Sequence, residues 1–281
     1  MQHLGMIAGA GEFPLLIARQ AHEAGRPLPT VALSTQIAAA LAPYCHTLAQ
    51  YGPGQVTKIL RELHRQGVKQ VVIVGKVHKQ FLFETPRLDF RALRLLRQLR
   101  DYRDGALFEA IQQEFAREGI EIVAQTRLLG HLLTPQGVLG MRRPSAREWD
   151  DIRYGFVQAK QVVALDIGQT LVVRHRTVLA VEAVEGTDAA IRRGCQLGRR
   201  GAVIVKVSRP QQDPRFDIPA VGPDTLREVI AGRARVLAVE AGRTLMLHRD
   251  DLVASANAHR VALVGVTPQM WEARGDRAKM I

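Results

Sequence analysis

Cysteine is scarce in this sequence: its 281 residues include only two, Cys45 and Cys195. They lie far apart, which excludes a disulfide framework and a paired-cysteine zinc or redox site. A lone cysteine is a weak signal for nucleophilic chemistry, because reactivity depends on surroundings that favour the thiolate. We therefore interpret both as small structural residues, with a catalytic thiol as the alternative.

Long apolar runs are also absent. No stretch reaches the roughly 18 apolar residues that a transmembrane helix needs. The residues after Met1 lack the basic and then apolar pattern of a secretory signal. Hydrophobic residues make up 47% of the chain and charged residues 23%, which is typical of a folded globular protein. The sequence therefore predicts a cytoplasmic protein.

Aromatic residues are few, at 5%, whereas the net charge is strongly positive, at +12. Such a charge attracts polyanions: nucleic acid, acidic lipid headgroups or phosphorylated ligands. Few aromatic side chains leave few stacking platforms for single-stranded nucleic acid. Known nucleic-acid-binding patterns are missing as well. We therefore expect no nucleic acid partner, and favour a lipid surface or a phosphorylated ligand.

Several catalytic motifs are missing. There is no phosphate-binding loop of the GxxxxGK[ST] type, no HExxH zinc motif, and no closely spaced Asp-x-His of the kind found in dimetal phosphoesterases. The nine histidines are scattered. Any metal should therefore be a hard ion bound through oxygen, and Mg²⁺ is the expected cofactor, with no ligand set assigned.

The first part of the chain alternates strand and helix patterns. Strands are predicted at residues 4–8, 30–33, 70–74 and 120–124, with helices at 15–24, 56–66, 89–101 and 105–118. This alternation predicts an α/β fold, with a parallel, Rossmann-like sheet in the N-terminal domain.

A stretch rich in glycine and proline, residues 130–145, forms a plausible junction between domains. We divide the chain into domains 1–132 and 133–281. Ser145 with Glu148 forms a capping box that starts a helix reaching about residue 164. Strand pairs then mix with helices: strands at residues 170–173, 178–184, 203–207, 236–239, 244–247 and 261–266. We predict a mixed α+β second domain.

Two glycine turns follow predicted strands of the first domain. Gly9 and Gly11 end the first strand, and Gly75 precedes Lys76 and Val77 after the third. Backbone amides at such turns can approach a phosphate, and parallel strands bind ligands at their carboxyl ends. The alternatives are a simple tight turn at Gly11 and a solvated side chain at Lys76.

Polar clusters in the second domain are candidates for chemistry. Thr187 and Asp188 link a strand to a helix, where they either bind a ligand or cap the helix. Asp217 lies in a stiff loop with two prolines. Its carboxylate could hold a metal ion or activate water, although turns also favour aspartate.

Arginines are spaced along residues 87–103, the segment that contains the predicted helix at 89–101, beside an apolar stripe. A helix of this kind can lie on an anionic membrane surface. The alternative is an ordinary core helix with a solvated basic face.

The sequence resembles the UDP-2,3-diacylglucosamine pyrophosphatases of the lipid A pathway, the family unrelated to the dimetal phosphoesterases. The resemblance spans nearly the whole chain and rests on four blocks and Lys206: GMIAGAG at 5–11, LDIGQ at 165–169, AVEAVEGTD at 180–188 and FDIPAVG at 216–222. The EGTD block and the block around Asp217 are specific, whereas the opening glycines are not.

The resemblance implies a nucleotide-binding N-terminal domain and a lipid-recognising C-terminal domain. It implies hydrolysis of UDP-2,3-diacylglucosamine to UMP and 2,3-diacylglucosamine 1-phosphate (lipid X), with magnesium. The catalytic aspartate of the family corresponds to Asp217. Its ligand contacts correspond to Gly11, Lys76, Val77, Gln169, Thr187 and Asp188, and Lys206 is a further candidate near the phosphates. Because Asn can replace Lys76 in the family, contact there is expected through the backbone.

The diacyl substrate implies work at the inner face of the cytoplasmic membrane, and family analogy suggests a homodimer. The rival interpretation is a non-catalytic module that binds a nucleotide-sugar or an acidic lipid. A nucleic-acid binder is a distant third.

Overall fold

The computed structural model describes residues 3–77, 88–98 and 104–272. The chain forms two compact units. The first contains Met1–Leu128 and Pro214–Phe216, and the second contains Leu129–Asp213 and Asp217–Ile281. Each unit is described below by itself.

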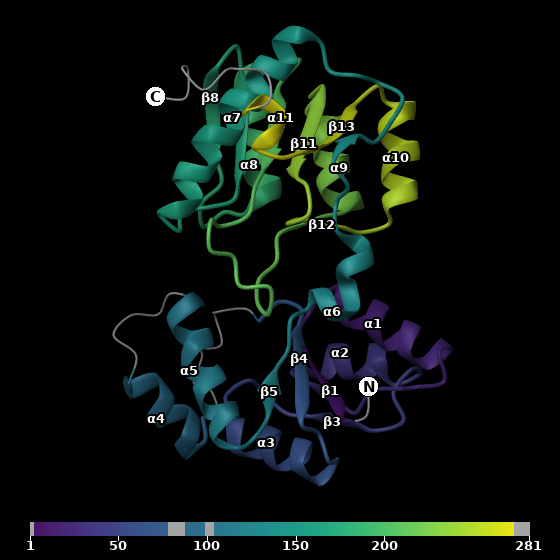
Figure 1. Ribbon diagram of the computed structural model, residues 1–281, viewed down its shortest axis with the longest axis vertical. Helices are drawn as coiled ribbons and strands as arrows, with labels where there is room; N and C mark the ends of the chain where they lie inside the picture. Colours follow the sequence, from purple (N-terminus) through teal and green to yellow (C-terminus); the bar gives the residue numbers. More distant parts are fainter. Residues whose placement is uncertain (1–2, 78–87, 99–103, 273–281) are drawn as a thin grey trace. The chain divides into compact units, whose positions relative to one another are not determined.

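The first unit is built on a five-stranded parallel sheet of order β3-β2-β1-β4-β5 (Figure 1). This is the order of the first five strands in doubly wound α/β sheets. Its strands are β1 (Leu4–Ala8), β2 (Thr30–Ala32), β3 (Leu48–Gln50), β4 (Gln70–Val74) and β5 (Glu121–Ile122). Its helices are α1 (Glu12–Glu23), α2 (Thr35–Leu41), α3 (Val56–Arg65), α4 (Phe90–Gln98) and α5 (Asp104–Arg117), and α6 (Thr126–Leu129) ends it. The predicted parallel sheet is confirmed.

Hydrophobic periodicity explains how α3 and α5 cover this sheet. Ile59, Leu60 and Leu63 form the buried stripe of α3, and Phe108 and Phe115 that of α5. These side chains pack in one cluster with strand residues such as Ile7 and Val31. The central strand β1 is buried along its whole length, as expected for a strand covered on both faces.

The second unit is built on a six-stranded mixed sheet of order β6-β13-β11-β9-β7-β8. Strands β9 (Val203–Lys206), β11 (Val236–Glu240) and β13 (Ala262–Val266) are parallel. Strands β6 (Gly137–Val138), β7 (Thr170–Arg174) and β8 (Thr177–Val181) pair antiparallel with their neighbours. A separate parallel pair joins β10 (Ala220–Val221) and β12 (Leu245–Met246). The predicted mixed sheet is confirmed.

Helices cover both faces of the mixed sheet (Figure 1). Helix α7 (Ala146–Ala164) packs on one face, together with Trp271 of α11 (Gln269–Glu272). The other face is buried by α8 (Thr187–Gly198), α9 (Pro223–Ala231) and α10 (Arg249–Ala258). The predicted capping box is present at α7, where Ser145 and Glu148 bond each other's backbone amides. The short helix η2 (Gly130–Leu132) opens the unit.

Several element predictions needed correction. Helix α2 and strand β3 were not predicted, and neither were the two-residue strands β6 and β10. These elements are too short to give a clear periodic pattern. The strand expected at residues 178–184 ends at Val181, because the chain turns there toward α8. The helix expected at 89–101 is described as α4 up to Gln98, and residues 99–103 lie outside the described residues.

Candidate active site

The two glycine turns of the first unit lie side by side. Strands β1 and β4 are neighbours, and beyond them Ala10 and Lys76 form an isolated antiparallel bridge. The amide of Ala10 donates to the Lys76 carbonyl at 2.8 Å, and the amide of Lys76 donates to the Ala10 carbonyl at 2.7 Å. A Cβ at Gly9 would lie 2.7 Å from the Lys76 carbonyl oxygen. Glycine is therefore required there by the close approach of the two turns.

Gly11 has a different reason to be glycine. Its φ is 113°, a conformation that L side chains rarely adopt, and a Cβ there would meet nothing within 4 Å. It is the N-cap of α1, with no side-chain cap, so the helix starts with its backbone toward open space. This suits an anion at the helix N-terminus. Lys76 and Val77 are the other two candidates in this unit. The Lys76 amide donates to the Ala10 carbonyl, and Val77 is 40% exposed.

In the second unit, the ends of three adjacent strands bring several candidates together. Gln169 lies just before β7, and its carbonyl accepts from the amide of Val207 at 2.9 Å. Lys206, the last residue of β9, pairs in register with Thr170. Despite its charge, Lys206 is only 7% exposed. A buried ammonium group needs compensating polar partners.

Thr187 supplies one of these partners. It is the first residue of α8, and its Oγ1 lies 2.8 Å from Lys206 Nζ and 2.8 Å from Glu182 Oε1. The N-cap is Gly186, with φ 83° and no side-chain cap. The helix-capping alternative for Thr187 and Asp188 is therefore wrong: Thr187 uses its hydroxyl between Lys206 and Glu182, and Asp188 lies in the first turn.

Asp217 lies in the loop that follows β9 and is held by an arginine. Arg209 Nη1 lies 2.8 Å from Asp217 Oδ2, and Arg209 Nε lies 2.9 Å from Asp166 Oδ1. Partial burial alone would lower the pKa of Arg209, but its bonds to Asp217 and Asp166 raise that pKa above its usual value. The guanidinium therefore stays charged and links the Asp217 loop to the turn at residues 165–169.

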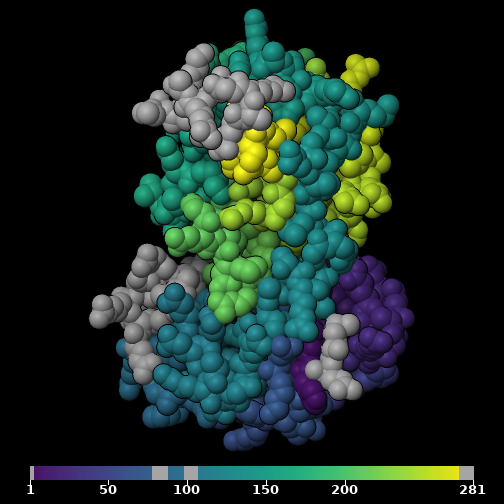
Figure 2. All heavy atoms as spheres, viewed as in Figure 1, coloured from purple at the N-terminus to yellow at the C-terminus, as the bar shows by residue number. Residues whose placement is uncertain are grey.

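Asp217 also has an unusual backbone. Its φ is 47°, as is uncommon for a residue other than glycine, and Asp166 at the other end of the same arginine has φ 58°. Non-glycine residues in the left-handed region cost free energy and concentrate at functional positions. The loop lies at the surface of the face drawn in Figure 2, in light green. The Asp217 side chain is 48% exposed, so it is accessible to a ligand.

Contacts within the second unit hold the start of the Asp217 loop. At its start, Ser208 donates its amide and its hydroxyl to Glu240 Oε2, at 2.8 and 2.9 Å. Glu240 is 4% exposed and pairs with Lys160 of α7 at 3.0 Å. Within the first unit, Phe216 stacks on Phe108 with ring centroids 4.7 Å apart.

Sequence reasoning missed three residues of this arrangement: Arg209, Glu182 and Glu240. Glu182 lies inside a motif block but carried no separate signal. Arg209 is one of many arginines, and Glu240 ends an apolar strand. Their roles depend on partners up to 80 residues away, which no local pattern reveals.

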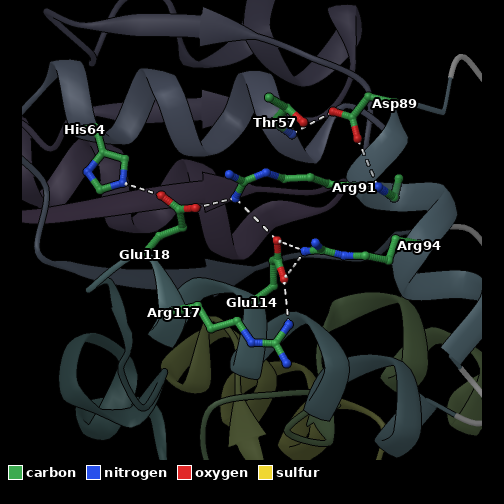
Figure 3. A network of polar contacts seen from close by, with 9 residues as sticks. Thr57, His64, Asp89, Arg91, Arg94, Glu114, Arg117 and Glu118 are labelled. Carbon is green, nitrogen blue, oxygen red and sulfur yellow. Dashed lines mark hydrogen bonds and ion pairs between the residues drawn. The ribbon is translucent and has the colours of Figure 1, made fainter.

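Two arginines of the basic helix are paired within the first unit. Figure 3 shows Arg91 and Arg94 of α4 directed toward Glu114 of α5, with Arg117 on its other side. Glu114 is 1% exposed. Arg91 also bonds Glu118. Arg87, Arg100 and Arg103 lie outside the described residues.

No helix within the described residues is long and apolar enough to cross a membrane. The same residues contain no group of three or more His, Cys, Asp or Glu side chains arranged to hold a metal ion. Asp217 and Asp166 offer two hard carboxylate donors, and both are paired with Arg209. This donor set fits a Mg²⁺ ion that takes most of its ligands from a bound diphosphate and water.

Both cysteines are free. Burial, with a smaller effect from the charge of Glu228, raises the pKa of the Cys195 thiol to about 11. Burial also raises the pKa of Cys45. Both shifts disfavour the thiolate, which supports a structural role for these residues.

A parallel α/β sheet with glycine turns and a mixed sheet with a buried lysine at a helix N-terminus define a two-domain α/β protein with sites suited to phosphate. Residues 3–132 match the LpxI N-terminal domain, and residues 135–264 match the LpxI C-terminal domain. UDP-2,3-diacylglucosamine pyrophosphatase LpxI of Caulobacter vibrioides is 34% identical to this chain in an alignment that covers 96% of this chain and 99% of that protein. The chain belongs to the LpxI family.

Proposed function

We propose that this protein is an enzyme of lipid A biosynthesis that hydrolyses the pyrophosphate of UDP-2,3-diacylglucosamine to UMP and 2,3-diacylglucosamine 1-phosphate. The observation that carries the proposal is the match, over 96% of the chain, to the pyrophosphatase of Caulobacter vibrioides. In this assignment the N-terminal domain binds the UDP group and the C-terminal domain recognises the lipid.

The site chemistry supports a reaction at phosphorus. A diphosphate carries dense negative charge, which the charged Lys206 and the N-terminus of α8 would neutralise. Gly11 and the Lys76–Val77 turn would supply backbone donors to the nucleotide phosphates. A phosphate bound by the Lys76 amide would have to displace its bond to Ala10, so Val77 is the better amide donor of the pair.

Asp217 is the proposed catalytic residue. An exposed carboxylate on a held loop can orient the attacking water and accept its proton. Arg209 would keep the charge and direction of that carboxylate fixed. Gln169 and Asp188 flank the same strand ends and helix start, where they would contact the sugar phosphate.

Mg²⁺ is part of the proposal. The ion would neutralise the diphosphate, and holding that ion is the alternative to the role of Asp217 as the base. Activity should disappear on thorough chelation with EDTA and return with added Mg²⁺. Full activity after chelation would remove the metal from the proposal.

The direct test is release of UMP from purified UDP-2,3-diacylglucosamine, followed by chromatography with and without Mg²⁺. The rival function, a non-catalytic binding module, predicts that the lipid binds without turnover. Binding without UMP release by the wild-type protein would favour the rival. Salt-dependent binding to mixed RNA or DNA, unaffected by UDP, would favour the third alternative.

We also propose a peripheral location at the inner face of the cytoplasmic membrane, through an apolar edge of the second unit. Leu165, Ile167 and Val184 are 72%, 48% and 105% exposed. They lie on adjoining turns, because a Cβ at Gly168 would come within 2.0 Å of the Glu182 carbonyl oxygen. Exposed apolar side chains beside a lipid-headgroup site suit insertion at the bilayer interface.

Sedimentation with phosphatidylglycerol-containing vesicles tests this location. Val184→Glu should reduce the bound fraction, since it places a charge on the apolar edge. Leu197→Glu is the matched control, because Leu197 is 65% exposed but lies at the far end of α8. Equal binding by both variants would contradict the proposed edge. A homodimer, suggested by family analogy, is tested by light scattering after size exclusion.

A further inference from the structure

Three polar side chains form a row across adjacent strand ends of the mixed sheet. Strand β7 lies between β8 and β9, and Thr170 at its start pairs with Lys206. The amide of Glu182, just after β8, donates to the Thr170 carbonyl at 2.9 Å. Alternate residues of a strand point to opposite faces, so these three side chains share one face. It is the face buried beneath α8 by Ala180, Val172 and Ile204.

Helix α8 begins over this row with Thr187. The Thr187 hydroxyl touches the charged groups at both ends: Lys206 Nζ at 2.8 Å and Glu182 Oε1 at 2.8 Å. Lys206, Thr187 and Glu182 therefore form a continuous hydrogen-bonded chain.

The hydrogen bonds of this chain can have only one donor-to-acceptor direction. An ammonium group donates and cannot accept, so Lys206 donates to Thr187 Oγ1. A carboxylate accepts and cannot donate, so the single hydroxyl proton of Thr187 goes to Glu182. In this arrangement the Thr187 hydroxyl cannot donate to a bound phosphate. Donation to phosphate falls to the Lys206 ammonium and to the amides in the first turn of α8.

Electrostatics supports the same arrangement. Lys206 is 7% exposed, and a buried charge needs an opposite charge nearby. The carboxylate of Glu182 is such an opposite charge, and only the Thr187 hydroxyl group lies between it and the Lys206 ammonium. Among other charged groups in this region, Asp188 lies in the first turn of α8, whereas Glu240 at the end of β11 is paired with Lys160 of α7.

The second oxygen of Glu182, Oε2, is buried and makes no hydrogen bond within the described residues. A carboxylate placed only to stabilise the fold would ordinarily have both oxygens bonded. Holding a half-satisfied carboxylate against Thr187 costs stability, and such local conflicts are characteristic of functional sites.

We propose that Glu182 is a positioning residue for pyrophosphate hydrolysis: it fixes the Thr187 hydroxyl as an acceptor and thereby directs the Lys206 ammonium toward the substrate diphosphate. The proposal rests on the hydrolase function proposed above.

A double-mutant cycle tests whether Glu182 acts through Thr187. Steady-state kcat and KM are measured with UDP-2,3-diacylglucosamine for Glu182→Ala, Thr187→Val and the double variant. Each single change should lower kcat/KM by about 10-fold or more. The kcat/KM of the double variant should lie within about twofold of that of the less active single variant, because either change alone already breaks the hydrogen-bonded chain.

A conservative variant separates position from charge. Glu182→Gln keeps an acceptor for the Thr187 proton, so it should retain more activity than Glu182→Ala. If Glu182→Ala fails to fold, the cycle is run with Glu182→Met, which has a similar size but no oxygen to accept the Thr187 proton. Glu228→Gln is the matched control, because Glu228 is a carboxylate of the same unit paired with Arg192 of α8. It should leave kcat/KM unchanged.

Losses that multiply in the double variant, or a normal kcat/KM in Glu182→Ala, would overturn the proposal. A fall in the unfolding midpoint without coupling in the cycle would assign Glu182 a purely structural role and would also overturn it. If the wild-type protein releases no UMP, the hydrolase function fails. In that case the affinity of the same variants for inorganic pyrophosphate is measured by calorimetry, which tests the role of Glu182 separately from hydrolysis.

Discussion

Arg209 and Asp217 form an ion pair in which guanidinium Nη1 and carboxylate Oδ2 are 2.8 Å apart. The same guanidinium holds Asp166, and both aspartates have a left-handed backbone. One side chain therefore ties together two backbone segments in costly conformations. This arrangement gives Asp217 a defined direction before any ligand is bound.

Arg209→Ala should lower kcat/KM by about 10-fold or more, because Asp217 loses the group that orients it. Arg209→Lys should recover only part of the loss, since an ammonium lacks the fork that contacts two carboxylates at once. The measurement is steady-state UMP release. Arg227→Ala removes an exposed pair with Asp224 and serves as the control. A faster reaction in Arg209→Ala would instead make the ion pair an inhibitory contact.

Asp217→Asn should lower kcat by about 10²-fold while the lipid still binds, because it removes the charge that would accept a proton from water. Asparagine tolerates the left-handed backbone, so the loop geometry is kept. Single-turnover UMP release and lipid binding are compared with those of Asp224→Asn. Turnover near the wild-type rate in Asp217→Asn would exclude this residue as the base.

Glu114→Gln should lower the free energy of unfolding by about 3 kcal/mol, because it removes the partner of three arginines at a buried position (Figure 3). Urea unfolding gives the value. Glu62→Gln is the comparison, since Arg65 beside it is 67% exposed, and a surface pair is worth at most about 1 kcal/mol. Equal losses in the two variants would show that burial does not strengthen the Glu114 pairs.

Cys195 should resist alkylation at pH 8. Because burial raises its pKa to about 11, roughly one thiol in a thousand is ionised at that pH. The rate with iodoacetamide should rise as pH increases toward the pKa and should rise strongly on unfolding in guanidinium. Mass spectrometry of the labelled peptide provides the measurement. Rapid labelling of Cys195 in the folded protein at pH 8, with loss of activity, would instead support the alternative that Cys195 is a catalytic thiol.

Local signals were enough for much of the fold. Alternating apolar runs and helical stripes identified most strands and helices of both sheets, and Ser145 with Glu148 marked the start of α7. Helix α2 and strands β3, β6 and β10 were missed because these short elements give no clear periodic pattern. The turns at Gly11 and Gly75 were found because glycine is itself a backbone signal.

Residues whose roles depend on pairing were not found in this way. Arg91 and Arg94 suggested a basic surface, but the structure pairs them with the buried Glu114. Nothing near Arg209 in the sequence marks it among the other arginines. Its two aspartates are 8 and 43 residues away.

The sequence by itself determined the alternation of strands and helices, the glycine turns, and the blocks at residues 180–188 and 216–222 that relate this chain to its family. Only the tertiary structure decided that Lys206, Thr187 and Glu182 form one hydrogen-bonded chain and that Arg209 holds Asp217. The physical reason is that turn and helix preferences act over a few residues. Ion pairs and hydrogen-bond directions depend on which strand ends the sheet brings together.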